Sequence, residues 1–132
     1  MKGYGDPYKK KRNKNIKLSK KQVINQAIKL HLKGNIREAK KYYQQIIKVG
    51  WNDPRVFANY GIILRNSGNL KEAETSFRKA IELNPSDANA HSNLGNLLRD
   101  LGNLKEAEIY QRKAIKINPS LANAHSLSLI HI

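Results

Sequence analysis

A repeat of 34 residues runs through most of this chain and constrains its fold more than any other feature. Shifting the sequence by 34 positions aligns the same residue types in three copies: Gly34, Gly68 and Gly102; Asn35, Asn69 and Asn103; Ala39, Ala73 and Ala107. A fixed period of this length is typical of stacked supersecondary units, because one such unit cannot bury its apolar face alone. The sequence therefore predicts an array of successive, similar units.

Each unit is predicted to contain two amphipathic helices. In the third copy, residues 88–101 place His91, Leu94 and Leu98 at steps of three and four residues, which is the spacing of one helix face. The glycine that follows is expected to end this helix in the left-handed conformation, at no steric cost. The second helix then begins after Asn103.

Three kinds of helix start can be read from the sequence. Ser19 and Gln22 have the spacing of a capping box, and Asp53 stands directly before a proline, as an N-cap residue often does. In every copy, an asparagine followed three residues later by a glutamate opens the second helix, which predicts the same box at Asn35–Glu38, Asn69–Glu72 and Asn103–Glu106.

Small residues are expected where the two helices of each unit meet. They recur at one position of each helix and are Ala27, Gly61 and Gly95 in the first helix and Ala39, Ala73 and Ala107 in the second. If the two sets face each other, the helices can approach closely, which a leucine would prevent by overpacking.

The second and third copies resemble tetratricopeptide repeats. The family pattern is matched in the third copy by His91, Leu94, Gly95, Leu98, Gly102, Ala107, Ala114 and Pro119. In the second copy it is matched by Phe57, Tyr60, Gly61, Leu64, Gly68, Ala73, Phe77, Ala80 and Pro85. The first copy is divergent, with Trp51 where the pattern has proline. The resemblance covers about residues 19–126 and implies an all-α fold, a right-handed α-solenoid of antiparallel helix pairs.

The expected organisation is a basic leader, three repeats and an incomplete fourth. The leader, residues 1–18, is predicted to be disordered, because it cannot bury enough apolar surface to offset its chain entropy. The three repeats are assigned to 19–53, 54–87 and 88–121, and the start of the fourth to 122–132.

The fourth copy stops abruptly. It begins as ANAHS at residue 122, like the third copy at residue 88, and continues as LSLIHI, which resembles the in-frame translation of a transposon-type sequencing adapter. We interpret residues 127–132 as non-native and the chain as the amino-terminal fragment of a longer array; the alternative is a short apolar cap. The uncovered end around Ile109 and Ile117 is expected to be sticky.

Signatures of catalysis and of cofactor or metal binding are missing from the sequence. It has no phosphate-binding glycine loop, no His-Glu-x-x-His pair, no nucleophile elbow and no cysteine. His91 and His125 are equivalent residues of neighbouring repeats, on the order of 10 Å apart, which is too far to share one metal ion. The fragment is predicted not to be an enzyme, and no cofactor is expected.

In the tetratricopeptide family the first helices line a concave groove, and the family's groove positions can be transferred to this sequence. Asn25, Asn59 and Asn93 occupy one such position in all three copies. A carboxamide both donates and accepts, so this row can pair with the backbone of an extended peptide. It resembles the ladder in the arrays of O-linked N-acetylglucosamine transferases; the alternative is an asparagine that is merely tolerated there. Further predicted groove residues are Arg55, Arg65, Asn66, Asn96 and Arg99, whose arginines would favour acidic ligands or carboxylate ends.

Basic charge is concentrated in the leader. The chain carries a formal net charge of +15, and residues 1–22 hold nine of its 25 Lys and Arg residues with one acidic residue. Lys9, Lys10, Lys11 and Arg12 offer a site for RNA or an anionic membrane, whereas the alternative is a solvated tail. No run of about 18 apolar residues is present and no apolar stretch follows the leader, so a cytoplasmic chain is predicted.

Three functions are open at this stage. The first is a non-catalytic scaffold that holds a protein or an extended peptide, acidic ones included, in the concave groove. The second is the substrate-recruiting arm of a larger glycosyltransferase or sulfotransferase, whose catalytic domain would lie beyond this fragment. The third is binding of RNA or an anionic surface through the leader.

Overall fold

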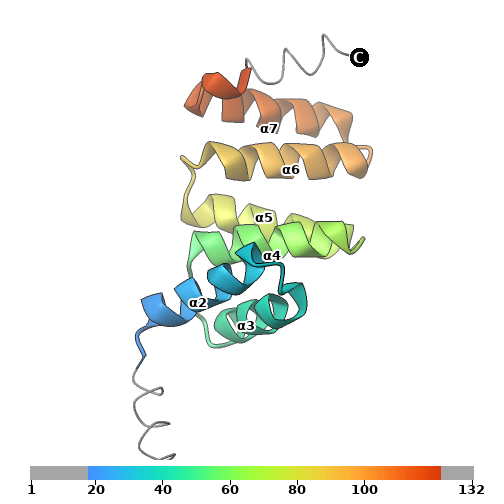
Figure 1. Ribbon diagram of the computed structural model, residues 1–132. Helices are drawn as coiled ribbons and strands as arrows, with labels where there is room; N and C mark the ends of the chain where they lie inside the picture. The colour runs from blue at the N-terminus through green and yellow to red at the C-terminus, as the bar shows by residue number, and fades with distance from the viewer. Residues whose placement is uncertain (1–17, 123–132) are drawn as a thin grey trace, which may run out of the picture.

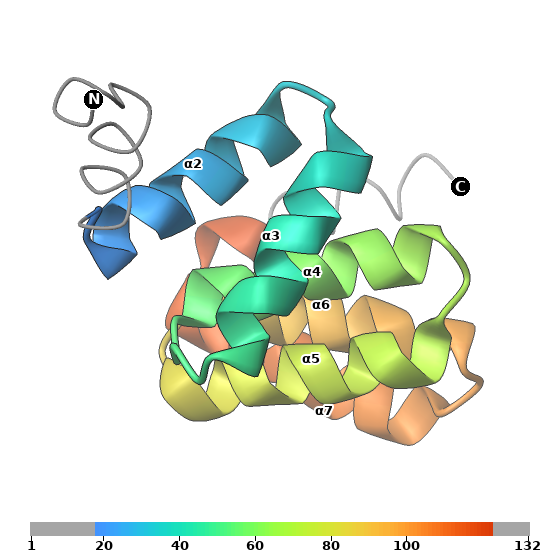
Figure 2. The same cartoon turned by 90° about the horizontal axis from the view of Figure 1, so that it is seen from below.

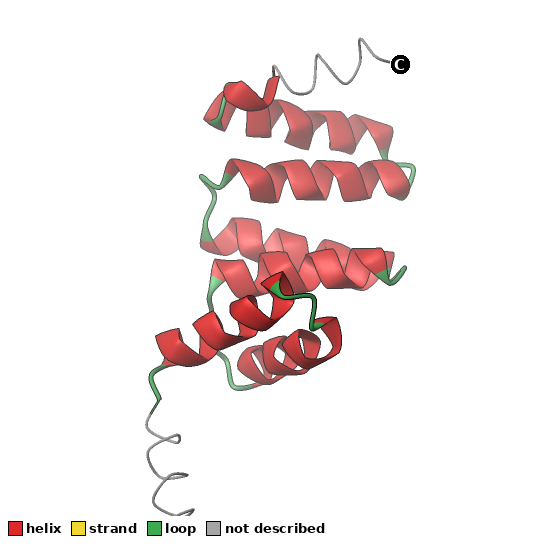
Figure 3. Ribbon diagram, viewed as in Figure 1, coloured by secondary structure: helices red, strands yellow, loops and turns green. Residues whose placement is uncertain are grey.

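The computed structural model describes residues 18–122 of the chain. They form six α-helices, namely α2 (Lys20–Leu32), α3 (Ile36–Lys48), α4 (Pro54–Asn66), α5 (Leu70–Leu83), α6 (Ala88–Asp100) and α7 (Leu104–Ile117). This part of the chain contains no strand (Figure 3), so the predicted all-α fold is confirmed. None of the six helices is long and apolar enough to cross a membrane. The predictions for the leader and for residues 127–132 fall outside the described residues.

The helices form three antiparallel hairpins that follow one another in a single stack (Figure 1). We call them repeat 1 (α2 and α3), repeat 2 (α4 and α5) and repeat 3 (α6 and α7). Each helix contacts the next one along the chain, and the first helices also contact each other, α2 with α4 and α4 with α6. Because contacts join only neighbouring hairpins, the predicted α-solenoid of helix pairs is confirmed. Figure 2 shows repeat 1 turned relative to the other two.

The first helices begin as predicted. The Ser19 side chain accepts a hydrogen bond from the Gln22 backbone at 3.1 Å, and the Gln22 side chain accepts one from the Ser19 backbone at 2.9 Å, which completes the capping box. Asp53 caps α4 by accepting from the Arg55 backbone at 2.8 Å. Asp87 caps α6 in the same way.

The capping boxes predicted at the second helices are wrong. No side-chain cap bond is made by Asn35, Asn69 and Asn103. Asn69 instead donates its backbone N–H to the Leu64 carbonyl at 2.8 Å, and Gly68 donates to the Arg65 carbonyl at 3.0 Å, which is a Schellman ending of α4. The Asn69 N–H is therefore unavailable to Glu72. Its ψ of 69° also departs from the extended conformation of a capping residue.

The turns inside the hairpins depend on glycine. Gly34, Gly68 and Gly102 have φ of 88°, 86° and 86°, so the predicted left-handed conformation is confirmed. An L-residue there would bring its Cβ too close to the following carbonyl oxygen, at about 1–2 kcal/mol. Each turn can therefore reverse the chain within a few residues.

Two further glycines set the distance between the helices of repeats 2 and 3. A Cβ on Gly61 would lie 2.6 Å from the ring of Phe77, and one on Gly95 would lie 2.6 Å from the side-chain amide of Gln111. The predicted close approach is confirmed. The nearest side chain, however, comes from Phe77 or Gln111, one turn beyond the expected alanine, because that longer side chain lies across the first helix.

The core continues through all three repeats. Its largest fully buried side chains are Tyr43, Phe77, Ile46, Leu64, Leu94, Leu97, Leu98 and Val56. In the last described helix, Ile109 is 51% exposed and Ile117 is 40% exposed, and the stickiness of this end stays a prediction.

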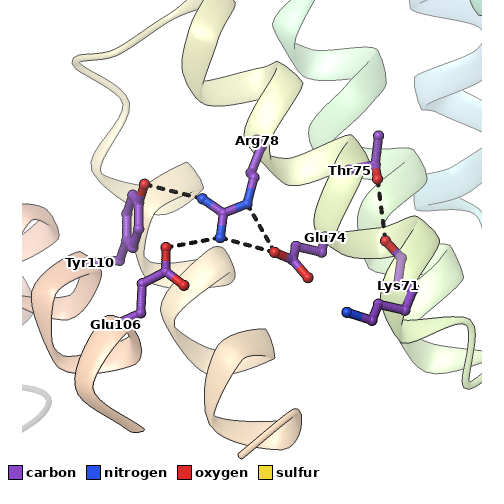
Figure 4. Close-up of polar contacts among 6 residues, drawn as sticks. All are labelled: Lys71, Glu74, Thr75, Arg78, Glu106 and Tyr110. Carbon is purple, nitrogen blue, oxygen red and sulfur yellow. Dashed lines mark hydrogen bonds and ion pairs between the residues drawn. The ribbon is translucent and has the colours of Figure 1, made fainter. Parts of the chain in front are cut away.

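An arginine joins the second helices of repeats 2 and 3 (Figure 4). Arg78 in α5 donates to Glu74 on its own helix and to Glu106 on α7, both at 3.0 Å, and to the Tyr110 hydroxyl at 3.3 Å. Its guanidinium carbon lies 5.7 Å from the centroid of the Tyr110 ring. Repeat 1 has the neutral Gln44 at the equivalent position. The junction between repeats 2 and 3 is therefore the more strongly paired of the two.

The two kinds of helix start give a testable difference in stability. Ser19→Ala is expected to lower the free energy of unfolding by about 1 kcal/mol, because it removes a capping bond. Asn69→Ala is expected to change it by less than about 0.5 kcal/mol, because that side chain makes no capping bond. Urea unfolding followed by circular dichroism measures both values. Equal losses of unfolding free energy in the two variants would contradict the conclusion that Ser19 caps its helix and Asn69 does not.

Candidate peptide-binding groove

The first helices of the three repeats line a hollow of about 470 Å³. Its floor combines aliphatic side chains with carboxamides and hydroxyls, and one acid and one base lie at its edge. The lining residues are Ile28 from α2, Arg55, Ala58, Asn59 and Ile62 from α4, and Asp87, Asn89, Ala90, Ser92 and Asn93 from the start of α6. We call this hollow the groove.

Two of the three asparagines predicted to form a ladder meet in the groove. Asn59 and Asn93 are half-buried and line it from α4 and α6. Asn25 is exposed on α2 and lies outside it. Repeat 1 is turned relative to repeats 2 and 3 (Figure 2), and α2 lines the groove through Ile28 instead.

The two groove asparagines have different surroundings. Burial raises the pKa of Tyr43, and the nearby Asn59 side chain partly offsets this increase. The Nδ1 atom of His31 lies 3.1 Å from the same hydroxyl, and burial lowers the pKa of His31. Repeat 2 has Phe77 in place of the tyrosine, so Asn93 has no equivalent hydroxyl beside it. The two asparagines therefore differ in that only Asn59 lies near a tyrosine hydroxyl.

Two of the three arginines predicted for the groove already have carboxylate partners. Arg55 holds Asp53 through two bonds, Nε to Oδ1 at 3.2 Å and Nη2 to Oδ2 at 3.0 Å. Arg65 donates from Nε to Asp100 at 2.7 Å, across the junction of repeats 2 and 3. Arg99 is exposed and forms no ion pair within residues 18–122. The positive rim is therefore weaker than the sequence suggested.

The pair at Arg55 is stable over a wide pH range. Burial by itself would raise the pKa of Asp53, but hydrogen bonds from the Arg55 side chain and backbone outweigh it, and the net result is a lowered pKa. The Asp53 carboxylate therefore stays ionised at neutral pH and continues to occupy Arg55.

The remaining predicted groove residues lie away from the hollow. Asn96 accepts a hydrogen bond from Gln111 at 2.8 Å, so it serves the contact between α6 and α7. Asn66 is exposed at the end of α4. The predictions omitted Asp87 and Ala90, which line the groove. Asp87 could have been predicted from the sequence, because it is the N-cap residue of α6 as Asp53 is of α4.

His91 packs within repeat 3. It is 5% exposed, its Nε2 atom lies 2.7 Å from the Pro85 carbonyl oxygen, and its ring stacks on Tyr110 with 5.8 Å between centroids. Between residues 18 and 122, no group of three or more His, Cys, Asp or Glu side chains is placed to hold a metal ion. His125 lies outside the described residues.

The comparison with solved structures identifies the fold. MamA aligns with a TM-score of 0.69 and 18% identity, over 75% of this chain and 58% of that one. An O-GlcNAc transferase mutant from Thermobaculum terrenum aligns with 0.72 and 24%, over 80% of this chain and 20% of that one. PcrH, in complex with the chaperone binding region of PopB, aligns with 0.69 and 19%, over 79% and 86%. At these identities the likeness concerns the fold alone.

The chain is thus shorter than the first two of these proteins, spanning 58% of the MamA chain and 20% of the transferase chain. No curated protein sequence matches it. A family model described as tetratricopeptide repeat matches residues 60–122, which contain most of repeat 2 and all of repeat 3. Within residues 60–122, the 34-residue units therefore match the tetratricopeptide repeat family.

Proposed function

We propose that this chain is a non-catalytic interaction scaffold that holds an extended peptide in the groove between α4 and α6. The observation that carries the proposal is the placement of Asn59 and Asn93 in one hollow of about 470 Å³. Each carboxamide can donate to a peptide carbonyl and accept from a peptide N–H, so the pair can hold a main chain whatever its side chains. The complex of PcrH with a segment of PopB supports a binding role for this fold.

The groove floor favours apolar side chains on the ligand. Ile28, Ala58, Ile62 and Ala90 supply an aliphatic surface beside the two asparagines. Burying a ligand's aliphatic side chain against this surface contributes about 25 cal/mol for each Å² removed from water. Hydrogen bonds to the main chain and apolar contacts together would then provide the affinity.

The paired arginines argue against an acidic ligand. To bind Arg55 or Arg65, a ligand carboxylate would have to displace Asp53 or Asp100 from hydrogen bonds that are already made. Such an exchange replaces one ion pair by another and gains little. We therefore propose an uncharged extended segment as the ligand, in place of the acidic one that the sequence favoured.

Selection from a random peptide library displayed on phage tests this proposal on the full chain. Peptides bound by the unchanged protein are expected to bind the double variant Asn59→Ala, Asn93→Ala about tenfold or more weakly, since two hydrogen bonds of about 1 kcal/mol each are lost. The single variant Asn25→Ala is expected to bind as the unchanged chain does.

The matched control is the double variant Asn69→Ala, Asn103→Ala, which removes two asparagines from the turns outside the groove. It is expected to retain full affinity. The groove proposal fails if no peptide is enriched, or if the groove variant, shown by circular dichroism to be folded, binds as tightly as this control.

A second candidate is the recruiting arm of a larger glycosyltransferase or sulfotransferase. The shared fold with part of an O-GlcNAc transferase, of which this chain spans 20%, favours it. Sequencing the locus past the codon of Ser126 tests it. An open frame that adds further repeats and a transferase domain supports the recruiting arm and the interpretation of residues 127–132 as non-native. A stop codon directly after Ile132 contradicts both.

Binding through the leader receives no support from the comparisons or the fold. Lys9, Lys10, Lys11 and Arg12 lie outside the described residues, so their role stays a prediction from sequence. Persistence of RNA binding after deletion of residues 2–15 would contradict it.

A further inference from the structure

Within residues 18–122, the Arg78–Glu74 pair at the junction of repeats 2 and 3 has a second, more exposed copy in α7. Arg78 and Glu74 in α5 lie under repeat 3, and their side chains are 37% and 20% exposed. The equivalent residues 34 positions later, Arg112 and Glu108 in α7, form the same pair at 2.6 Å but are 77% and 61% exposed. Arg112 therefore has the arrangement of Arg78 without the groups that Arg78 binds on the next repeat.

Two aliphatic side chains of α7 are likewise more exposed than their equivalents in α5. Leu70 in α5 is half-buried and packs against the core, whereas its equivalent Leu104 is 65% exposed. Leu83 is half-buried as well, whereas its equivalent Ile117 is 40% exposed. We call Leu104, Glu108, Arg112 and Ile117 the tail face. It has the composition of a surface that is covered one repeat earlier.

Repeat 1, at the opposite end of the stack, carries a glutamate and a tyrosine of the kind that Arg78 binds. Arg78 is bound by Glu106 and Tyr110. Their equivalents in repeat 1 are Glu38 and Tyr42, four residues apart on α3.

These two residues line a hollow of about 350 Å³ together with apolar side chains. It is formed by Val23, Glu38, Lys41, Tyr42, Gln45, Ile46, Val49 and Trp51, which we call the head face. The Glu38 side chain is 57% exposed, and its ion pair, with Lys41 at 3.7 Å, is made on its own helix. Tyr42 is 37% exposed.

We propose that copies of this 132-residue chain join head to tail. The tail face of one copy packs on the head face of the next, and Arg112 binds Glu38 and Tyr42 of the next copy as Arg78 binds Glu106 and Tyr110 within one copy. The interface is heterologous, since two different surfaces meet, so successive copies extend the stack instead of closing a dimer.

The charged groups on the tail face and the head face favour a second copy of this chain as the partner of the tail face. Arg78, which pairs with a glutamate on its own helix, also binds a carboxylate and a hydroxyl on α7, and the chain displays the same two groups on α3. The formal net charge of +15 opposes association at low ionic strength. This repulsion is screened over about 8 Å at 0.15 M salt, whereas the short contacts of the interface persist.

Sedimentation velocity of the full chain at physiological salt tests the proposal. The unchanged chain is expected to form species that grow with concentration. A head-blocked variant, Glu38→Arg with Tyr42→Ala, and a tail-blocked variant, Arg112→Glu, should each self-associate about tenfold or more weakly, since each loses a charged partner at the interface. Mixed together, they should form a one-to-one complex, because one keeps an intact tail and the other an intact head.

The matched controls are Glu82→Arg and Lys71→Glu, which make similar charge changes on exposed positions of the middle repeat and should leave association unchanged. Four results would overturn the proposal: a chain that stays monomeric at every concentration, a tail-blocked variant that associates like the unchanged chain, blocked variants that each form homodimers, or association only after truncation at Ala122. The last result would place the chain's own final residues on the tail face.

The head-to-tail contact is independent of the groove. Peptides selected on the unchanged chain should bind the head-blocked and tail-blocked variants with unchanged affinity, because none of the substituted residues lines the groove. Loss of self-association and loss of peptide binding are thus distinguishable.

Discussion

Phe77→Ala is expected to lower the free energy of unfolding by about 3–5 kcal/mol, which is the usual cost of removing a fully buried aromatic side chain. Phe77 is 1% exposed and lies in the core that joins the repeats. A domain of this size is stable by about 5–15 kcal/mol, so the variant should lose a large fraction of its stability. Urea unfolding monitored by circular dichroism measures the change.

The matched control for this variant is Phe57→Ala in α4. Phe57 is half-buried, so the same chemical change removes less apolar surface from the core. It is expected to cost no more than about half as much, in the range of about 1–2 kcal/mol. Equal losses at the two positions would contradict the central place of Phe77.

Gly61→Leu is expected to destabilise the chain by about 3 kcal/mol or more, the upper end of the cost of overpacking a core. A single Cβ at this position would already lie 2.6 Å from the Phe77 ring, and a leucine adds three further carbons in the same space. Urea unfolding again provides the measurement. Asn66→Leu, which places the same side chain at an exposed site of the same helix, is the control and is expected to change stability by less than about 0.5 kcal/mol.

A double-mutant cycle decides whether the contact with Phe77 causes the loss. Phe77→Ala removes the ring that Gly61→Leu would strike, so the two substitutions together should cost at least about 1 kcal/mol less than the sum of their separate effects. Strict additivity would show that the new leucine strikes some other part of the core.

Much of the fold could be predicted because its signals are local. A left-handed residue at Gly68, a capping box at Ser19 and an N-cap at Asp53 each depend on a few neighbouring residues, and all three are confirmed. The boxes at the second helices failed because two local motifs compete for the same backbone N–H. At Asn69 the Schellman bond to Leu64 takes it.

The groove could be predicted less completely because its chemistry depends on distant partners. Arg65 is occupied by Asp100, which lies 35 residues away in sequence, and no local pattern connects them. Repeat 1 is turned relative to the other two (Figure 2), and a local sequence pattern does not encode the orientation of one repeat relative to the next. The repeat period could locate groove positions but could not give their final geometry.

The paired arginines between repeats 2 and 3 make the two junctions of the stack different. The Arg65–Asp100 pair ties α4 to α6, and the Arg78–Glu106 pair ties α5 to α7, so ion pairs cross this junction at two separate points. Among the described residues no ion pair links repeat 1 to repeat 2, where Gln44 donates to the Tyr60 hydroxyl. Ion pairs therefore tie one junction of the stack, whereas the junction beside the α2 edge of the groove has a neutral hydrogen bond in their place.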